Sequence, residues 1–159
     1  MPSPLHSVSA SEAAAPRPTL LIVDDEEGPR QSLRIVFKDL YDVVLADNGP
    51  RALEIAKSRR VDAAVLDIRM AGMSGTELLG HLKQLDPHIE VVMLTAYETL
   101  ETARQALRHG ACDYLTKPFE IPIIREAVAN AVQRRALAEA MADGSKRVRE
   151  LQEEPRNVQ

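Results

Sequence analysis

The chain has 159 residues, of which 45% are hydrophobic and 28% are charged, and its formal net charge at pH 7 is −4. This length and composition are ordinary for one soluble globular domain with a complete hydrophobic core. The negative charge excludes a global electrostatic attraction to nucleic acid or to an anionic membrane surface. The single cysteine, Cys112, excludes an internal disulfide framework and is typical of a reducing compartment.

Residues 1–18 are rich in Pro, Ser and Ala, with neither a basic start nor an apolar core segment. We therefore expect a disordered N-terminal tail and no secretory signal. No run in the chain approaches the roughly 18 apolar residues that a membrane span needs. These features predict a cytoplasmic protein that makes no membrane contact.

From residue 19 onward, short apolar runs alternate with segments of helical spacing. In chain order, the predicted strands are residues 19–23, 42–46, 61–66, 89–94 and 113–116. The predicted helices follow the strands and are marked by Leu33, Val36, Phe37 and Leu40; by Ala52, Leu53, Ile55 and Ala56; by Leu78, Leu79, Leu82 and Leu85; by residues 99–109; and by a start near Pro122. Buried strands separated by helices predict a parallel sheet covered on both faces. The fold class is therefore α/β, a (βα)5 doubly wound sheet of five parallel strands in a three-layer α/β/α arrangement.

Polar side chains stand at the ends of four predicted strands. Asp24 and Asp25 follow the first strand, Asp67 the third, Thr95 the fourth and Lys117 the fifth. In an open parallel sheet, the carboxyl ends of the strands form the edge where ligands bind. Carboxylates, a hydroxyl and an ammonium group at this edge predict a site for a divalent cation and a phosphoryl group.

The carboxylates suit magnesium, which prefers oxygen ligands and binds through one or two carboxylates together with water and phosphate oxygens. Asp24, Asp25 and Asp67 would supply these oxygens, and without a cation they would repel one another. Glu26 is a further candidate, with a favourable charge at a helix N-terminus as its alternative role. A helix cap explains one aspartate after a strand, but not a pair matched at two other strand ends.

Asp67 is the predicted nucleophile, because a carboxylate can attack phosphorus and hold the group as an aspartyl-phosphate. The cation and Lys117 would neutralise the phosphoryl oxygens, and the Thr95 hydroxyl would bind one of them. The alternatives are structural: Asp67 as a cap of the next turn and Thr95 as an ordinary strand-end residue. The Lys117-Pro118 bond is a candidate cis peptide that would aim Lys117 inward.

Four segments in this order and spacing resemble the receiver (CheY-like, flavodoxin-like) domains of two-component response regulators, over roughly residues 18–138. They are Val23-Asp24-Asp25-Glu26, Leu66-Asp67-Ile68-Arg69-Met70, Leu94-Thr95-Ala96-Tyr97 and Tyr114-Leu115-Thr116-Lys117-Pro118-Phe119. The region around Asp67 is similar to regulators of the nitrogen-regulatory (NtrC) type.

The resemblance implies that Asp67 accepts a phosphoryl group from a sensor histidine kinase, a phosphotransfer protein or a small phosphodonor. It also implies Mg²⁺, with Mn²⁺ as a substitute, bound by Asp25, Asp67 and the backbone carbonyl of Arg69, while Asp24 holds a metal-bound water. The protein would be a signalling switch that catalyses only its own phosphorylation and dephosphorylation, rather than an enzyme acting on other substrates.

The family's switch is also implied for this chain. Thr95 would move toward the phosphoryl group and Tyr114 would turn inward, reshaping the face formed by the helix at 99–109, the strand at 113–116 and the last helix. The alternative for Tyr114 is a half-buried strand tyrosine. Arg69 and Tyr97 stand where the family tunes water access, and because both are bulky we expect a long-lived phospho-form. Ala71 replaces the usual proline, so its loop loses a backbone restraint.

The domain organisation predicted from the sequence is a tail at 1–18, a receiver domain at 19–138 and a helical or linker extension at 139–159. Leu137, Met141, Gly144, Val148 and Leu151 follow coiled-coil spacing, although Asp143-Gly144-Ser145 predicts a break. The extension is too short for an independent output domain. We expect a helix that either dimerises or transmits the signal, the homodimer then forming through the switch face and this helix. We expect no direct nucleic-acid contact, because basic and acidic residues are interleaved.

Rival functions fit less well. A phosphatase of the haloacid-dehalogenase type would need a second aspartate two positions after Asp67, where Arg69 stands. Glycine-rich nucleotide-binding loops and histidine spacing for zinc are absent from the sequence. The serious alternative is an adaptor with the receiver fold that works without phosphorylation, and the presence of every site residue argues against it.

Overall fold

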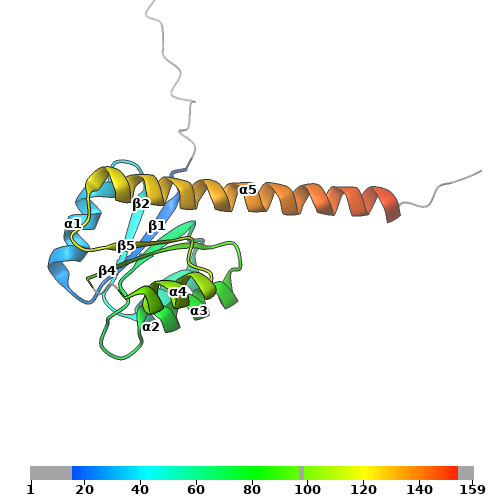
Figure 1. The fold of residues 1–159 in the computed structure, drawn as a ribbon. Helices are drawn as coiled ribbons and strands as arrows, with labels where there is room; N and C mark the ends of the chain where they lie inside the picture. Colours follow the sequence, from blue (N-terminus) through cyan, green and yellow to red (C-terminus); the bar gives the residue numbers. More distant parts are fainter. Residues whose placement is uncertain (1–15, 97–98, 154–159) are drawn as a thin grey trace, which may run out of the picture.

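The computed structural model describes residues 16–96 and 99–153, in which strands and helices alternate strictly (Figure 1). The strands are β1 (Thr19–Val23), β2 (Asp42–Ala46), β3 (Ala63–Leu66), β4 (Glu90–Thr95) and β5 (Asp113–Thr116). The helices are α1 (Glu27–Phe37), α2 (Gly49–Ser58), α3 (Gly75–Leu85), α4 (Leu100–Arg108) and α5 (Ile121–Glu153). The predicted (βα)5 pattern is confirmed. Residues 1–15 of the predicted tail lie outside the described residues.

All strand pairs are parallel, and the order in the sheet is β2-β1-β3-β4-β5. The direction of winding therefore reverses between β1 and β3, which makes their carboxyl ends the topological switch point of the sheet. Helices α1 and α5 cover one face, and α2, α3 and α4 cover the other. This arrangement confirms the doubly wound, three-layer architecture.

The two-residue period of the strands divides the core into two layers. Leu21 and Val23 of β1 pack with α2, α3 and α4, whereas Leu20 and Ile22 pack with α1 and α5. All four side chains are at most 1% exposed. Apolar residues on both sides of one strand are the reason why β1 reads as a continuous apolar run rather than an alternating one.

Two predicted strands begin later than expected. β4 starts at Glu90 rather than at residue 89. β3 starts at Ala63 rather than at residue 61, and Asp62 lies in a bend before it. The carbonyl of Val61 accepts a hydrogen bond from Arg135, and the carboxylate of Asp62 accepts one from the backbone N–H of Thr19. The backbone of Asp62 still bonds to both neighbouring strands, since its N–H donates to the carbonyl of Thr19 at 3.0 Å and its carbonyl accepts from the N–H of Glu90 at 3.5 Å. The difference is therefore confined to the end of the strand.

Further boundaries also differ. α4 runs from Leu100 to Arg108 rather than over residues 99–109, because Thr99 and His109 are its caps. α1 ends at Phe37, so Leu40 lies beyond the helix and is 52% exposed instead of facing the core. β4 includes Thr95 as its last residue, one position later than predicted, and Thr95 is fully buried. Helix and strand ends are the part of a structure that apolar periodicity specifies least.

The predicted break at Asp143-Gly144-Ser145 is wrong, since α5 continues through it to Glu153. A single interior glycine costs a helix only about 1 kcal/mol relative to alanine, which flanking helix-forming residues offset. Every residue from 140 to 153 is exposed, and this part of α5 projects beyond the domain in Figure 1. Within the described residues, no helix combines the length and apolarity needed to cross a membrane.

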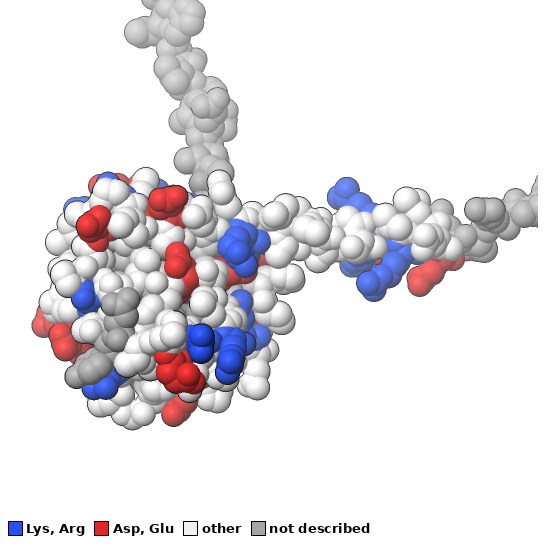
Figure 2. Space-filling view, viewed as in Figure 1, with Lys and Arg blue, Asp and Glu red and all other residues white. Residues whose placement is uncertain are grey.

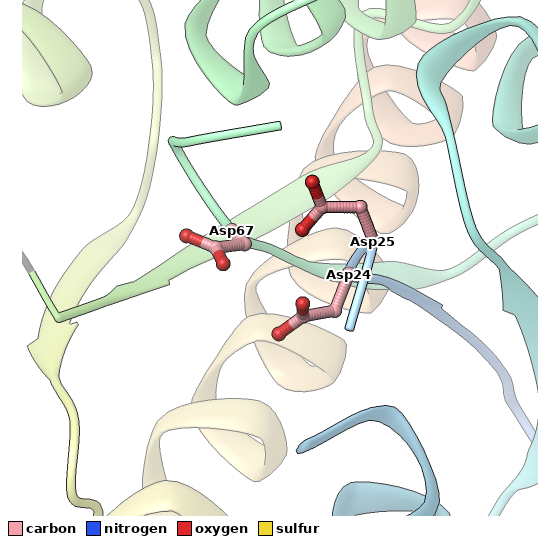
Figure 3. Close-up of side chains that lie close together, drawn as sticks. All are labelled: Asp24, Asp25 and Asp67. Atoms are coloured by element: carbon pink, nitrogen blue, oxygen red, sulfur yellow. The ribbon is translucent and has the colours of Figure 1, made fainter. Parts of the chain in front are cut away.

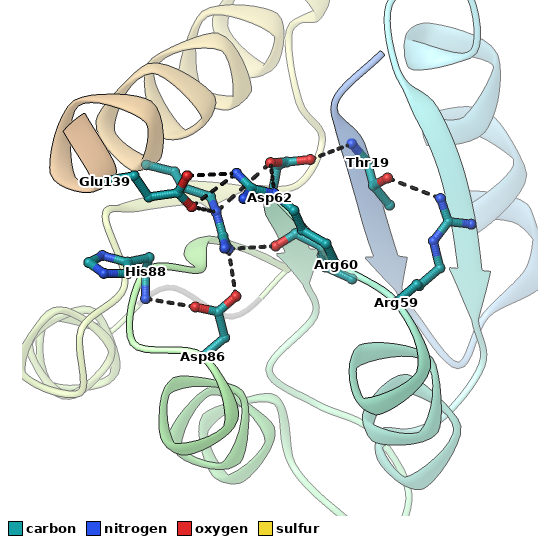
Figure 4. Close-up of polar contacts among 9 residues, drawn as sticks. Thr19, Arg59, Arg60, Asp62, Asp86, His88 and Glu139 are labelled. Atoms are coloured by element: carbon teal, nitrogen blue, oxygen red, sulfur yellow. Dashed lines mark hydrogen bonds and ion pairs between the residues drawn. The ribbon is translucent and has the colours of Figure 1, made fainter. Parts of the chain in front are cut away.

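A network of polar contacts, in which Figure 4 labels Asp62, Asp86 and Glu139, joins α5 to the amino-terminal edge of the sheet. Arg135 is 5% exposed; its guanidinium donates to the carbonyl of Val61 at 2.8 Å and lies 2.8 Å from an oxygen of Asp86. It also donates to Glu139 at 2.7 Å, and Glu139 pairs with Arg60 at 2.9 Å. These contacts hold α5 at the point where it leaves the domain.

The pKa values of two carboxylates in this network are shifted. Burial by itself would raise the pKa of Asp86, but hydrogen bonds from Arg135 and from the backbone of His88 outweigh it and lower the pKa. Glu139 behaves in the same way: burial opposes the shift, and hydrogen bonds from Arg60 and Arg135 lower its pKa. A carboxylate whose pKa is lowered by folding stabilises the protein above its unfolded pKa, and this contribution is lost as the pH falls.

Arg135→Met retains most of the apolar stem but removes the guanidinium. We expect the free energy of unfolding at pH 7 to fall by about 1–3 kcal/mol, because the Val61 carbonyl, Asp86 and Glu139 each lose a hydrogen bond from Arg135. The decrease in stability between pH 7 and pH 3 should also be smaller than in the wild type. Urea unfolding followed by circular dichroism at several pH values measures both effects, and an unchanged pH dependence would contradict the assigned role.

Candidate functional site

The carboxyl ends of β1 and β3 bring two aspartates to one place. Val23 pairs with Leu66 in the parallel register, so Asp24 and Asp67 follow neighbouring strands in step. The backbone N–H of Asp67 donates to the carbonyl of Val23 at 3.0 Å, which extends the sheet by one residue. The topology thus delivers both carboxylates to the switch point, as predicted from the strand ends.

Asp24, Asp25 and Asp67 form one cluster, in which each offers an oxygen within 4.8 Å of the others (Figure 3). Asp24 is 2% exposed and Asp67 is 9% exposed, whereas Asp25 is exposed. Burying carboxylates is unfavourable unless they accept hydrogen bonds or are paired with a cation. Three closely spaced carboxylates therefore require hydrogen-bond donors or cations beside them.

Backbone N–H groups hold each carboxylate in position. The N–H of Glu26 donates to Asp24 at 2.9 Å, so Asp24 holds the start of the segment that leads into α1. The loop after β3 binds the other two carboxylates. The N–H of Arg69 donates to the carboxylate of Asp67 and the N–H of Ala71 donates to that of Asp25, both at 3.3 Å. The side chain of Glu26 makes no cap hydrogen bond at the start of α1.

Lys117 enters the cluster from the end of β5. Its ammonium nitrogen lies 2.7 Å from a carboxylate oxygen of Asp24 and 3.1 Å from one of Asp67. The backbone N–H of Lys117 donates to the carbonyl of Thr95 at 2.8 Å, and the Lys117-Pro118 peptide is cis. The predicted inward orientation of the lysine is present.

Burial by itself would lower the pKa of Lys117, but hydrogen bonds and charge from Asp24, followed by those from Asp67, raise it. The ammonium form therefore persists at neutral pH. One ammonium among three carboxylates leaves two formal negative charges, which a divalent cation would balance. Because the donors are hard carboxylate oxygens and Asp25 is open to water, the set fits Mg²⁺.

The remaining predicted residues lie at different distances from this cluster. Thr95 is buried at the end of β4, on the same edge of the sheet as Asp67. Arg69 is exposed and contacts Asp67 through its backbone N–H. Tyr97 lies outside the described residues, and so its predicted role stays a prediction.

Tyr114 belongs to a separate group of residues between β5 and α4. Its side chain is half-buried, and its hydroxyl lies 3.3 Å from the hydroxyl of Thr102. Thr99 and Thr102 form a reciprocal capping box at the start of α4. The tyrosine is thus tied to the first turn of α4, an element of the predicted switch face.

Two residues near the site were missed by sequence reasoning. Arg30 of α1 donates to the backbone carbonyl of Asp24 at 2.9 Å, and Thr102 contacts Tyr114. The spacing of Thr99 and Thr102 was a detectable signal, because paired polar side chains three residues apart mark a helix start. The position of Arg30 carried no signal, since its contact depends on the direction in which α1 leaves β1.

Comparison with known proteins identifies the family and the fold of this chain. The response regulator receiver domain family matches residues 20–129. Sporulation initiation phosphotransferase F of Bacillus subtilis is 41% identical over 110 residues, which are 69% of this chain and 89% of that protein. The transcriptional regulatory protein ZraR of Klebsiella oxytoca is 37% identical over 122 residues, 76% of this chain but only 28% of that protein.

Solved structures agree with these relatives. A response regulator receiver domain protein from Clostridium thermocellum has a TM-score of 0.72 at 29% identity, covering 76% of this chain and 98% of that one. NtrX from Brucella abortus has a TM-score of 0.76 at 28% identity, covering 80% of this chain and 30% of that one. ZraR and NtrX support the predicted likeness to regulators of the NtrC type. The chain belongs to the response regulator receiver domains of two-component systems.

Proposed function

We propose that this receiver domain is a phosphorylation switch, in which Asp67 accepts a phosphoryl group from a sensor histidine kinase or a phosphotransfer protein. The observation that carries the proposal is the convergence of Asp67 with Asp24, Asp25 and Lys117 at the switch point of the sheet. A carboxylate, an ammonium group and a candidate cation site in contact are what phosphoryl acceptance requires.

In the proposed reaction, a carboxylate oxygen of Asp67 attacks phosphorus, and the P–N bond to the donor imidazole breaks with its electron pair going to nitrogen. The donor imidazole, protonated on its other ring nitrogen, then leaves as a neutral imidazole. Lys117, already 3.1 Å from Asp67, neutralises charge on the phosphoryl oxygens. The hydroxyl of Thr95 donates to one of these oxygens. Asp25, Asp67 and the Arg69 carbonyl would hold Mg²⁺ or Mn²⁺, with Asp24 acting through water, and the cation would neutralise the remaining charge.

The proposed signal then passes to the face formed by α4, β5 and α5. Movement of Thr95 toward the phosphoryl group would allow Tyr114 to leave its contact with Thr102 and turn inward. Since Thr102 is part of the α4 cap, this change alters the start of α4. Phosphorylation would thus bias an equilibrium between two arrangements of the same face.

Arg69 and Tyr97 are proposed to lengthen the life of the phospho-form by restricting the access of water to Asp67. We place the protein in the cytoplasm and expect no direct contact with nucleic acid. Basic and acidic side chains are intermingled over the face of the domain in Figure 2, which supports the second expectation. The alternative function is a phosphorylation-independent adaptor with the same fold.

Asp25→Asn removes one negative charge from the cluster. For the wild type we expect Mg²⁺ at 100 times its dissociation constant to stabilise the fold by about 2.7 kcal/mol, measured as a rise in melting temperature. The rise should be lost in Asp25→Asn. Asp47→Asn is a matched control, because Asp47 is also exposed after a strand but lies outside the cluster. An equal rise in Asp25→Asn would contradict the assigned metal site.

Incubation with acetyl phosphate and Mg²⁺ should add one phosphoryl group to the wild type, detected by intact mass. Asp67→Asn or a chelator should abolish the adduct, and Asp47→Asn should retain it. After removal of the donor, the adduct should decay faster in Arg69→Ala than in the wild type. If neither small donors nor a phosphohistidine donor modifies the protein, the adaptor alternative would replace the proposed switch.

We also propose a homodimer through the α4-β5-α5 face and the extension of α5. Support comes from the exposed apolar residues at coiled-coil spacing on α5, of which Met141 is 65% and Val148 is 54% exposed. Light scattering should show that the phospho-form is dimeric. Val148→Glu should weaken the dimer, whereas Ala142→Glu, an equal charge change on another face of the helix, should not. A phospho-form that is strictly monomeric would contradict this proposal.

A further inference from the structure

The start of α3 packs directly against the backbone of the predicted phosphoacceptor. Gly75 is the first residue of α3 and is buried. A Cβ atom at this position would overlap the carbonyl oxygen of Asp67, and it would lie 2.8 Å from the carbonyl carbon of Asp67 and from the Cα of Ile68. All three atoms belong to the main chain, so no side-chain rotation relieves the overlap.

Gly75 is needed for space rather than for backbone conformation. Among the described glycines, only Gly72 and Gly110 have a positive φ. The helix start is also fixed in place, because Ser74 caps it by accepting a hydrogen bond from the N–H of Glu77 at 3.2 Å. The N–H of Gly75 itself donates to the carbonyl of Ile68 at 2.8 Å. Helix and loop are therefore bonded together at the point of closest approach.

Two opposing contacts fix the peptide that carries Asp67. On one side, the N–H of Asp67 is bonded to Val23 of β1, which also leads to Asp24. On the other side, Gly75 contacts the Asp67 carbonyl without an intervening side chain. The separation of the carboxylates therefore depends on how closely α3 approaches β3.

We propose that Gly75 is a positioning residue for Asp67: the absence of a side chain lets α3 set the Asp67 carboxylate at the distance from Asp24 and Asp25 that cation binding and phosphoryl acceptance need. This inference rests on the proposed function. Any larger residue would displace the peptide between Asp67 and Ile68 or push α3 away from the sheet, and both movements change the cluster.

Two other glycines provide matched controls. Gly80 lies in the same helix and has nothing within 4 Å of a Cβ atom. Gly49 is the first residue of α2, and its nearest neighbour would be the flexible side chain of Met73, with the sulfur at 2.6 Å. Gly80→Ala thus tests the effect of alanine in α3, and Gly49→Ala tests a crowded helix start away from the Asp67 backbone.

The experiment compares Gly75→Ala, Gly80→Ala and Gly49→Ala with the wild type. Mn²⁺ affinity is measured by electron paramagnetic resonance, folded fraction by circular dichroism and urea unfolding, and phosphorylation by intact mass with acetyl phosphate. For folded Gly75→Ala we expect at least a tenfold weaker Mn²⁺ affinity and a phosphorylation rate lower by about a hundredfold, as a displacement near 1 Å produces at a reacting centre. Both controls should bind Mn²⁺ as the wild type does.

Wild-type Mn²⁺ affinity and phosphorylation rate in folded Gly75→Ala would overturn the inference, as would a loss of stability alone. If Gly75→Ala folds poorly, the measurements are made in trimethylamine N-oxide, which favours the compact state. If it remains unfolded there, Mg²⁺ is titrated into the wild type and followed by NMR. A larger chemical-shift change of the Gly75 amide than of the Gly80 amide supports the inference, and equal changes overturn it.

Failure to phosphorylate the wild type would instead count against the proposed function. The comparison of Mn²⁺ affinities would still test the role of Gly75, because it does not depend on phosphorylation.

Discussion

The structure depends on holding carboxylates close together at one edge of a parallel sheet. Asp24 and Asp67 are nearly buried at the ends of adjacent strands, where like charges repel and water is largely excluded. Backbone N–H groups and the ammonium group of Lys117 compensate for this cost. The loop after β3, the end of β5 and the start of α3 therefore all lie against Asp67.

Buried charge is also compensated by paired groups at the opposite edge of the sheet. There Arg135 is buried among carboxylates and a backbone carbonyl, and it fixes α5 as the helix leaves the domain. The aspartate cluster and this network lie at the two ends of the same strands, and α5 packs along the sheet between them. The proposed rearrangement of the α4-β5-α5 face would therefore involve a helix whose exit point is held by Arg135.

Apolar patterning predicted the elements well and their ends less well. The strand runs are apolar on both sides, because helices cover both faces of the sheet, and this made β1 and β4 easy to recognise. The errors at Val61, Leu40 and Gly144 have separate causes. The carbonyl of Val61 bonds to the distant Arg135, and α1 ends at Phe37 before it reaches Leu40. α5 continues through Gly144 because the flanking residues favour a helix.

The sequence by itself determined which residue types follow each strand, and in a parallel sheet this places Asp24, Asp67, Thr95 and Lys117 at one edge. Tertiary structure alone decided the contacts between different helices and strands: Arg30 on the carbonyl of Asp24, Arg135 on that of Val61, and Gly75 against the backbone of Asp67. These contacts depend on the angles and distances at which helices pack on the sheet. Periodicity specifies which face of a helix is buried, but it carries no information on which backbone atom that face will meet.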